Sequence, residues 1–101
     1  MAEDTPAQPA YVIGHISVKD PDKWADYRNR VPATLAPWNA ELVCRGKLAA
    51  VFAGRHAHSD MVVIRFPDLA SLHGWYDSAA YQALIALREQ AADIDLLAYE
   101  A

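Results

Sequence analysis

The chain has 101 residues and a formal net charge of -4, which suits one domain that buries its own apolar core. An acidic chain with no concentrated basic face excludes nucleic acid as a partner, because phosphate binding needs such a face. The single cysteine, Cys44, excludes an internal disulfide and fits a reducing cytoplasm.

Residues 1–10 are acidic and rich in Pro and Ala, the opposite of the basic and then apolar start of a signal peptide. We therefore expect a disordered lead-in over residues 1–10, followed by a single folded domain over 11–101. No apolar run approaches the length that crosses a membrane, so we expect a cytoplasmic protein without a membrane partner.

A first strand is predicted over 11–18, which is rich in β-branched residues and followed by a turn signal. Alternation divides it into two faces. One face is wholly apolar and suited to packing under helices: Val12, Gly14, Ile16 and Val18. The other face is mixed, which indicates a second, partly polar environment: Tyr11, Ile13, His15 and Ser17.

A helix is expected to begin with Asp20 as its N-cap and Pro21 as its first residue. Its apolar stripe consists of Trp24, Tyr27 and Val31. Pro32 predicts a break or kink near residue 31. The helical path should finish near Trp38, with Asn39 in the helix-ending role that Gly often takes.

Two further strand segments are predicted over 41–45 and 48–52, with a bend or bulge at Gly46-Lys47 between them. Residues 54–59 form a predicted loop that holds Arg55, His56 and His58. The clearest strand pattern covers 61–66, and Pro67 ends it.

Residues 68 to about 92 are predicted to be helical in two pieces that meet near Asp77-Ser78, with Ser78 capping the second piece. A last strand covers 93–100. The order β-α-β-β-α-β predicts an α+β, ferredoxin-like fold, with an antiparallel sheet and two helices on one face.

That fold leaves the second face of the sheet uncovered, and part of this face is apolar: Tyr11, Ile13, Met61 and Val63. Such a patch is unfavourable in water on a small monomer. Pairing two faces around a twofold axis would bury the patch and enclose a cavity. We therefore expect a homodimer that forms an α/β barrel and binds a small organic ligand.

An ordered set of short motifs runs from residue 11 to about residue 100. It comprises Tyr11 and its strand, Asp20-Pro21 with Trp24 and Tyr27, Arg45-Gly46, Gly54, Val62-Val63-Ile64 before Phe66-Pro67, Trp75-Tyr76 with Ser78, Tyr81-Gln82 and Arg88. This set resembles the small dimeric α/β-barrel proteins known as domain of unknown function 1330. The resemblance implies a ferredoxin-like protomer and a barrel-forming dimer, and it implies no assigned reaction. In fold alone the chain is also similar to muconolactone isomerases, small polyketide cyclases and cofactor-free monooxygenases.

The chain departs from the pattern of that family at several positions. The family more usually has Arg at His15, Asp at Ser17, Glu at Ala53 and Arg65, and Gly at Lys47. Several acidic positions are therefore neutral or basic here. A mechanism that needed those carboxylates would be in doubt for this chain.

His15, Arg65 and Arg45 are the predicted catalytic residues. Imidazole suits general acid-base work, so His15 on the mixed face is the predicted proton-transfer group, although a structural hydrogen bond across the sheet is the alternative. Arg65 shares the mixed face and needs an anion, either an acidic ligand or a carboxylate such as Glu41 or Asp95. Arg45 is expected on that face too, where it would bind a carboxylate or an enolate.

Aromatic side chains supply the predicted substrate-binding residues: Trp75, Tyr81, Tyr27 and Tyr99. Trp and Tyr form pocket walls, and a phenol donates hydrogen bonds, but the same side chains also serve as helix-to-sheet packing. Both interpretations remain open for this chain.

No metal or cofactor is expected. His56, His58 and Asp60 form a trio without a fourth ligand, which falls short of a zinc site. No phosphate loop or nucleotide fingerprint is present. Cys44 is expected beside Leu42 on the apolar face, as an inert core thiol.

Three functions remain open. The first is a cofactor-independent isomerase, lyase or cyclase that acts on a small organic acid or carbonyl compound in a cavity at the dimer. The second is a ligand-binding or accessory protein that uses the same pocket without turnover. The third is a structural dimer without a ligand. The sequence leaves open which substrate and pathway apply.

Overall fold

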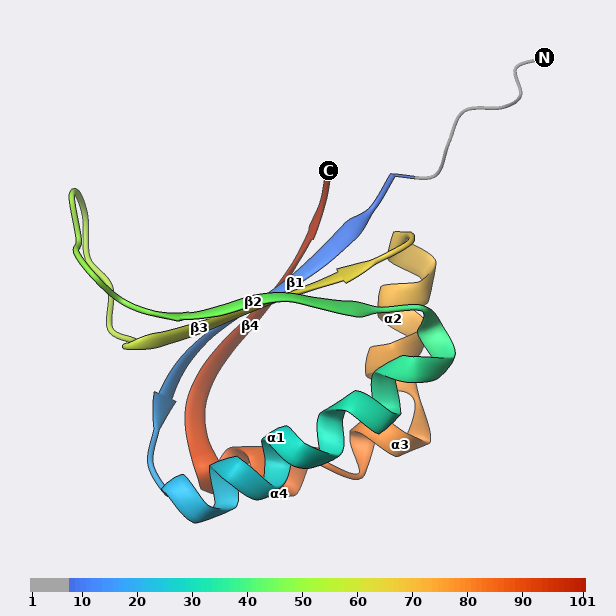
Figure 1. The fold of residues 1–101 in the computed structure, drawn as a ribbon, viewed down its shortest axis with the longest axis horizontal. Helices are drawn as coiled ribbons and strands as arrows, with labels where there is room; N and C mark the ends of the chain where they lie inside the picture. Colours follow the sequence, from blue (N-terminus) through green and yellow to red (C-terminus); the bar gives the residue numbers. More distant parts are fainter. Residues whose placement is uncertain (1–7) are drawn as a thin grey trace.

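Residues 8–101, which the computed structural model describes, form a four-stranded antiparallel sheet with its helices on one face (Figure 1). The strand order is β2-β3-β1-β4, so the predicted ferredoxin-like α+β fold is confirmed. Residues 1–7 of the predicted lead-in lie outside the described residues, and Ala10 already belongs to the first strand. The elements are β1 (Ala10–Val18), α1 (Pro21–Leu35), η1 (Ala36–Trp38), β2 (Glu41–Lys47), β3 (Asp60–Phe66), α2 (Leu69–Asp77), α3 (Ala79–Gln82), α4 (Ile85–Ala91) and β4 (Ala92–Glu100).

The first helix begins as predicted, because the Asp20 side chain accepts a hydrogen bond from the Lys23 backbone N–H at 3.1 Å. The predicted break near residue 31 is wrong: α1 runs unbroken through Pro32 to Leu35. The ring of Pro32 removes the donor for the carbonyl of Arg28. Both residues are exposed, so water is available to that carbonyl. Asn39 ends the helical path in the left-handed region, with φ 53°, as predicted.

Strand β2 differs from its prediction in the position of its irregularity. Gly46 and Lys47 pair regularly with β3, whereas the register slips between Leu42 and Cys44, so that Val43 is an extra residue. Residues beyond the bulge therefore face the side of the sheet opposite to the one that simple alternation predicts.

The predicted strand over 48–52 is absent, because residues 48–59 form an extended connection, here called the arm. Its base is closed by a hydrogen bond from the Leu48 N–H to the Ser59 carbonyl at 2.7 Å. Figure 1 shows the arm extending beyond the sheet and bending away from the helices. Residues 48–52 have no neighbouring strand with which their backbone could form ladder hydrogen bonds, so they do not extend the sheet.

The second helical region is divided at Ser78, as predicted. The Ser78 side chain accepts a hydrogen bond from the Tyr81 backbone N–H at 3.3 Å and so caps α3. A second division, between α3 and α4, was not predicted. Leu84 is the N-cap residue of α4, and its side chain forms no capping hydrogen bond. The sequence therefore has no capping residue that would predict the start of α4.

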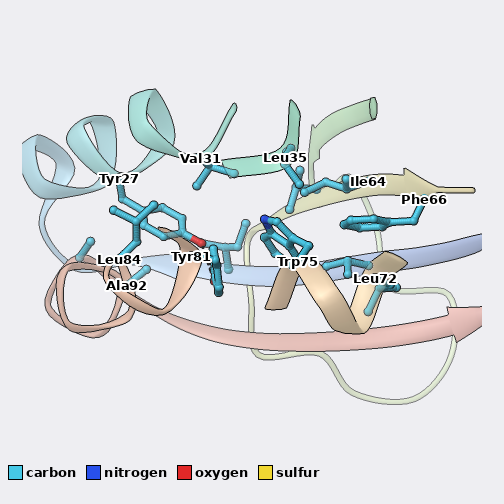
Figure 2. Packing of buried hydrophobic residues seen from close by; sticks show 14 of the residues in the cluster. Tyr27, Val31, Leu35, Ile64, Phe66, Leu72, Trp75, Tyr81, Leu84 and Ala92 are labelled. Atoms are coloured by element: carbon cyan, nitrogen blue, oxygen red, sulfur yellow. Dashed lines mark hydrogen bonds between the residues drawn. The ribbon is translucent and has the colours of Figure 1, made fainter. Parts of the chain in front are cut away.

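The core lies between the helices and the sheet, and large aromatic rings dominate it (Figure 2). Trp75, Tyr81 and Phe66 are almost fully buried, and the rings of Trp75 and Tyr81 lie 4.2 Å apart between centroids. The Trp75 indole Nε1–H donates to the Thr34 hydroxyl at 2.9 Å, so its polar group is satisfied inside the core.

Gly74 in α2 faces the ring of Trp38, and a Cβ at this position would overlap that ring. We expect Gly74→Ala to lower the free energy of unfolding by about 1–3 kcal/mol, since overpacking exceeds the gain of about 1 kcal/mol in helix propensity. Urea denaturation measures the change. Gly46→Ala is the control, because its Cβ would meet only the flexible Met61 side chain at 3.6 Å. A Gly74→Ala protein more stable than the wild type would contradict the expectation.

Candidate functional site

The face of the sheet away from the helices, here called the open face, carries the residues of highest functional interest. Its β1 residues are Tyr11, Ile13, His15 and Ser17, which are only partly buried. Across from them lie Met61, Val63 and Arg65 on β3, and Asp93, Asp95, Leu97 and Tyr99 on β4. Leu97 and Tyr99 are 42% and 50% exposed, so the face is apolar toward one end.

His15 lies where the arm meets the open face, and it lines a concave pocket of about 560 Å³, here called the arm pocket. Leu48–Ala53 of the arm form an apolar wall, and Arg55 and His56 add polar groups. The His15 and His56 rings meet edge to face, with centroids 4.9 Å apart. The His15 imidazole forms no hydrogen bond within residues 8–101, so its nitrogens are available to a ligand.

Beside His15, three polar side chains form a hydrogen-bonded chain. His58 Nε2 lies 3.0 Å from Asp95 Oδ2, and His58 Nδ1 lies 2.9 Å from Ser17 Oγ. An ionised carboxylate only accepts, so we assign a ring proton to Nε2. Ser17 Oγ also lies 3.4 Å from the Ala57 carbonyl, so its one hydrogen serves either Nδ1 or that carbonyl. His58 is nearly buried, with 13% of its side chain exposed, and it fastens the base of the arm to the sheet.

Sequence reasoning did not find this chain of hydrogen bonds. It grouped His58 with His56 and Asp60 as a weak metal trio and treated Asp95 as a partner of Arg65. No three His, Cys, Asp or Glu side chains within residues 8–101 are arranged to hold a metal ion. Strand parity already placed Ser17 and Asp95 on one face, but the return of the arm onto the sheet had no signal in the sequence.

Arg65 lies at the other end of the open face. It is opposite Tyr11, whereas His15 is opposite Met61, so four residues of strand, or roughly 13 Å, separate the two positions. The Arg65 Nη1 atom lies 3.4 Å from Glu41 Oε1, and Glu41 is one of the two carboxylates predicted as a partner. Tyr99 is also opposite Tyr11. The structure therefore does not bring Arg65 or Tyr99 together with His15.

Arg45 lies on the helix side of the sheet, and its prediction on the mixed face is wrong. It pairs with the buried Val62, because the extra residue Val43 reverses the parity of β2. The same reversal affects Cys44, which was predicted as a core thiol. Cys44 is exposed and pairs with Val63 on the open face.

Tyr27, Tyr81 and Trp75 are buried between the helices and the sheet, away from the arm pocket. The Tyr27 and Tyr81 hydroxyls are 2.9 Å apart, and an Arg88 guanidinium N–H donates to the Tyr81 oxygen at 3.0 Å. Burial and then the neighbouring Tyr81 raise the pKa of Tyr27 above its ordinary value, so this phenol stays neutral. Burial by itself would lower the pKa of Arg88, but Tyr81 and Glu89 raise it overall.

Positive charge near His15 comes from Arg55 and Lys47, which sequence reasoning did not select. Both line the arm pocket. Lys47 Nζ lies 3.3 Å from Asp60 Oδ2. The Ser59 hydroxyl, followed by Lys47, lowers the pKa of the Asp60 carboxyl, which therefore stays ionised.

Comparison with solved structures supports the fold. The RPA0582 protein of unknown function from Rhodopseudomonas palustris matches with a TM-score of 0.79 and 12% identity, over 97% of this chain and 85% of that chain. SnoaB, a cofactor-independent oxygenase from Streptomyces nogalater, matches with a TM-score of 0.66 and 13% identity, over 94% of each chain. A dimeric ferredoxin-like protein of unknown function from Thermobifida fusca matches with a TM-score of 0.63 and 16% identity, over 94% of this chain and 92% of that chain.

No curated protein matches the chain. Among the described residues, no helix has the length and apolar character needed to cross a membrane. The model of one family matches residues 9–101. The chain therefore belongs to the family described as domain of unknown function (DUF1330).

Proposed function

We propose that this protein is a cofactor-independent enzyme that transfers a proton on a small organic acid or carbonyl compound in the arm pocket. The observation that carries the proposal is the His15 imidazole, which lines a pocket of about 560 Å³ and forms no hydrogen bond within residues 8–101. A pocket of this size suits a small organic molecule. Isomerase, lyase and cyclase reactions that pass through an enolate begin with such a proton transfer.

The residues around His15 supply complementary roles. Imidazole takes up and releases protons near neutral pH, so His15 is the acid-base group. Arg55 and Lys47 would stabilise the negative charge that develops when a carbon acid loses its proton. His56 lies against the His15 ring and would hold its orientation.

The apolar parts of the arm favour a site that is completed by a second copy of the chain. Phe52 is 99% exposed at the arm, and Leu48 and Val51 are each nearly half exposed. Pairing two open faces around a twofold axis would cover apolar residues on both the arm and the sheet. The dimeric, ferredoxin-like protein from Thermobifida fusca supports this assembly by analogy of fold. We place this homodimer in the cytoplasm, which suits an exposed thiol at Cys44.

Turnover of small aromatic and aliphatic acids and ketones tests the proposal, with solvent deuterium incorporation followed by NMR. We expect His15→Gln to lower kcat by about 10²–10⁴-fold, the usual contribution of general acid-base catalysis. Arg55→Gln should also lower kcat, since it removes a charge that stabilises the developing negative charge. His73→Gln, which changes an exposed imidazole on α2 outside the arm pocket, is the matched control. Wild-type exchange rates in His15→Gln would overturn the assignment.

Binding without turnover is the alternative function. It is favoured by one observation: among residues 8–101, the only carboxylate that lines the arm pocket is Asp60, which is paired with Lys47. A binding protein would retain ligand affinity but show no deuterium exchange with any acid of the panel.

Light scattering tests the proposed homodimer separately, because a stable monomer would rule out a cavity shared between two copies.

A further inference from the structure

A second cleft lies on the helix side of β2, where sequence reasoning expected no site. It has a volume of about 250 Å³ and is lined by Ile16, Trp24, Arg28, Arg45, Gly46, Lys47, Asp60 and Met61. We call it the arginine cleft. It shares Lys47, Asp60 and Met61 with the arm pocket, whereas Trp24, Arg28 and Arg45 do not line the arm pocket.

The protein balances only part of the positive charge in this cleft: among its described lining residues Asp60 is the one carboxylate, and the charge of Arg28 helps to lower the pKa of that group. Within residues 8–101, neither Arg28 nor Arg45 has a carboxylate within 4.0 Å, and Asp60 is already paired with Lys47. Partial burial and then the neighbouring charge of Arg28 lower the pKa of Arg45, so the two guanidinium groups oppose each other. Two such arginines in a chain with a net charge of -4 concentrate positive charge at one place. An anion bound between them would relieve the repulsion.

Trp24, Arg28 and Arg45 also line a small neighbouring cavity of about 30 Å³, and Tyr27 lines the wall of that cavity. Arg88 donates to the Tyr81 oxygen, and Tyr81 is 2.9 Å from Tyr27. The single bond between the two phenols uses only one of their two hydrogens, so the other hydrogen has no acceptor within residues 8–101. Because the Tyr81 oxygen already accepts a hydrogen bond from Arg88, which strengthens Tyr81 as a donor, we assign Tyr81 as the donor to Tyr27. The hydrogen without an acceptor then belongs to Tyr27, a residue that lines the cavity.

We propose that the arginine cleft binds a small carboxylate that carries a second oxygen, such as a hydroxy or oxo acid. Its carboxylate would lie between Arg28 and Arg45, its apolar body against Trp24, and its second oxygen would accept the hydrogen bond of Tyr27. The volume of about 250 Å³ lies below the range of about 300–1,000 Å³ typical of drug-sized ligands, so the ligand is small. The small neighbouring cavity has room for one oxygen-bearing group.

Calorimetric titration with 4-hydroxybenzoate, benzoate and the neutral benzamide tests this proposal. We expect 4-hydroxybenzoate to bind more tightly than benzoate, and benzamide not to bind. Arg45→Gln and Arg28→Gln should each weaken both carboxylates at least about tenfold, as expected when a charged hydrogen bond worth about 1.5–3 kcal/mol is lost. Tyr27→Phe should remove the preference for 4-hydroxybenzoate and leave benzoate binding unchanged.

Arg30→Gln is the matched control, because Arg30 lies on the same helix but is paired with Asp26 at 2.8 Å outside the cleft. Thermal melting shows whether each variant is folded. The binding that Arg28→Gln and Arg45→Gln weaken but His15→Gln does not belongs to the arginine cleft, and any binding that His15→Gln weakens belongs to the arm pocket. The proposal is overturned if neither carboxylate binds saturably at millimolar concentration, or if Arg28→Gln and Arg45→Gln bind both as tightly as the wild type.

Discussion

Trp75→Ala is expected to lower the free energy of unfolding by about 3–5 kcal/mol, the usual cost of replacing a buried large aromatic by alanine. Trp75 is 1% exposed and packs against the rings of Phe66 and Tyr81. Its removal leaves a cavity between α2 and the sheet, and the Thr34 hydroxyl loses the N–H that donates to it, although it still donates to the Val31 carbonyl at 2.7 Å. Since small domains are stable by only about 5–15 kcal/mol, urea denaturation should show a large shift in midpoint.

Two milder variants separate the packing of Trp75 from its hydrogen bond. Trp75→Phe keeps an aromatic ring and loses the donor, whereas Thr34→Val removes the acceptor at the other end of the 2.9 Å bond. The double-mutant cycle should give a coupling of about 1 kcal/mol. A Trp75→Ala protein within about 1 kcal/mol of the wild type would show that the ring is not a core element, contrary to its burial.

Arg88→Ala is expected to lower the free energy of unfolding by about 3 kcal/mol. Part of this loss is the packing of the aliphatic part of the Arg88 side chain, and part is the hydrogen bond that the guanidinium donates to Tyr81. Arg88 is 9% exposed, and its Nε has no hydrogen-bond partner in the described part of the chain. Arg88→Met keeps the apolar stem and removes the costly buried charge, so its loss should be only about 1 kcal/mol.

Chemical denaturation of both Arg88 variants distinguishes the two contributions. Similar losses for Arg88→Met and Arg88→Ala would mean that the guanidinium, rather than the stem, holds α4 against Tyr81. Glu89→Gln is the control for the other partner of Arg88. Glu89 Oε2 lies 3.1 Å from Arg88, but 64% of the side chain is exposed, so this change should have little effect.

The fold could be predicted from local signals that agree with one another. Alternation in β1 predicted both faces correctly, because its register has no irregularity against β3 or β4. Asp20 and Ser78 marked helix starts through capping chemistry that depends only on neighbouring backbone N–H groups. The interpretation of Trp75 and Tyr81 as helix-to-sheet packing agrees with their burial.

The candidate site was less predictable, because it depends on one inserted residue and one long connection. Val43 reverses the parity of β2, and nothing in the local sequence places the bulge there rather than at Gly46. The partners of His58 are 37 and 41 residues away, so only the path of the arm brings them together. Arg28 was not selected from the sequence because its proposed role depends on Arg45 lying nearby. Only the bulge in β2 places Arg45 on the helix side of the sheet, where Arg28 is.

The bulge in β2 also bears on how copies of this protein can associate. β2 is an edge strand, and beside the bulge it exposes Leu42 and Val43, which are each about half accessible. A regular apolar edge strand can pair with a strand of another copy, and repeated pairing of this kind leads to open-ended aggregation. The extra residue interrupts the spacing of the free N–H and C=O groups, so an incoming strand cannot match them continuously. Association by the face of the sheet, which closes after two copies, is thereby favoured over growth along the β2 edge.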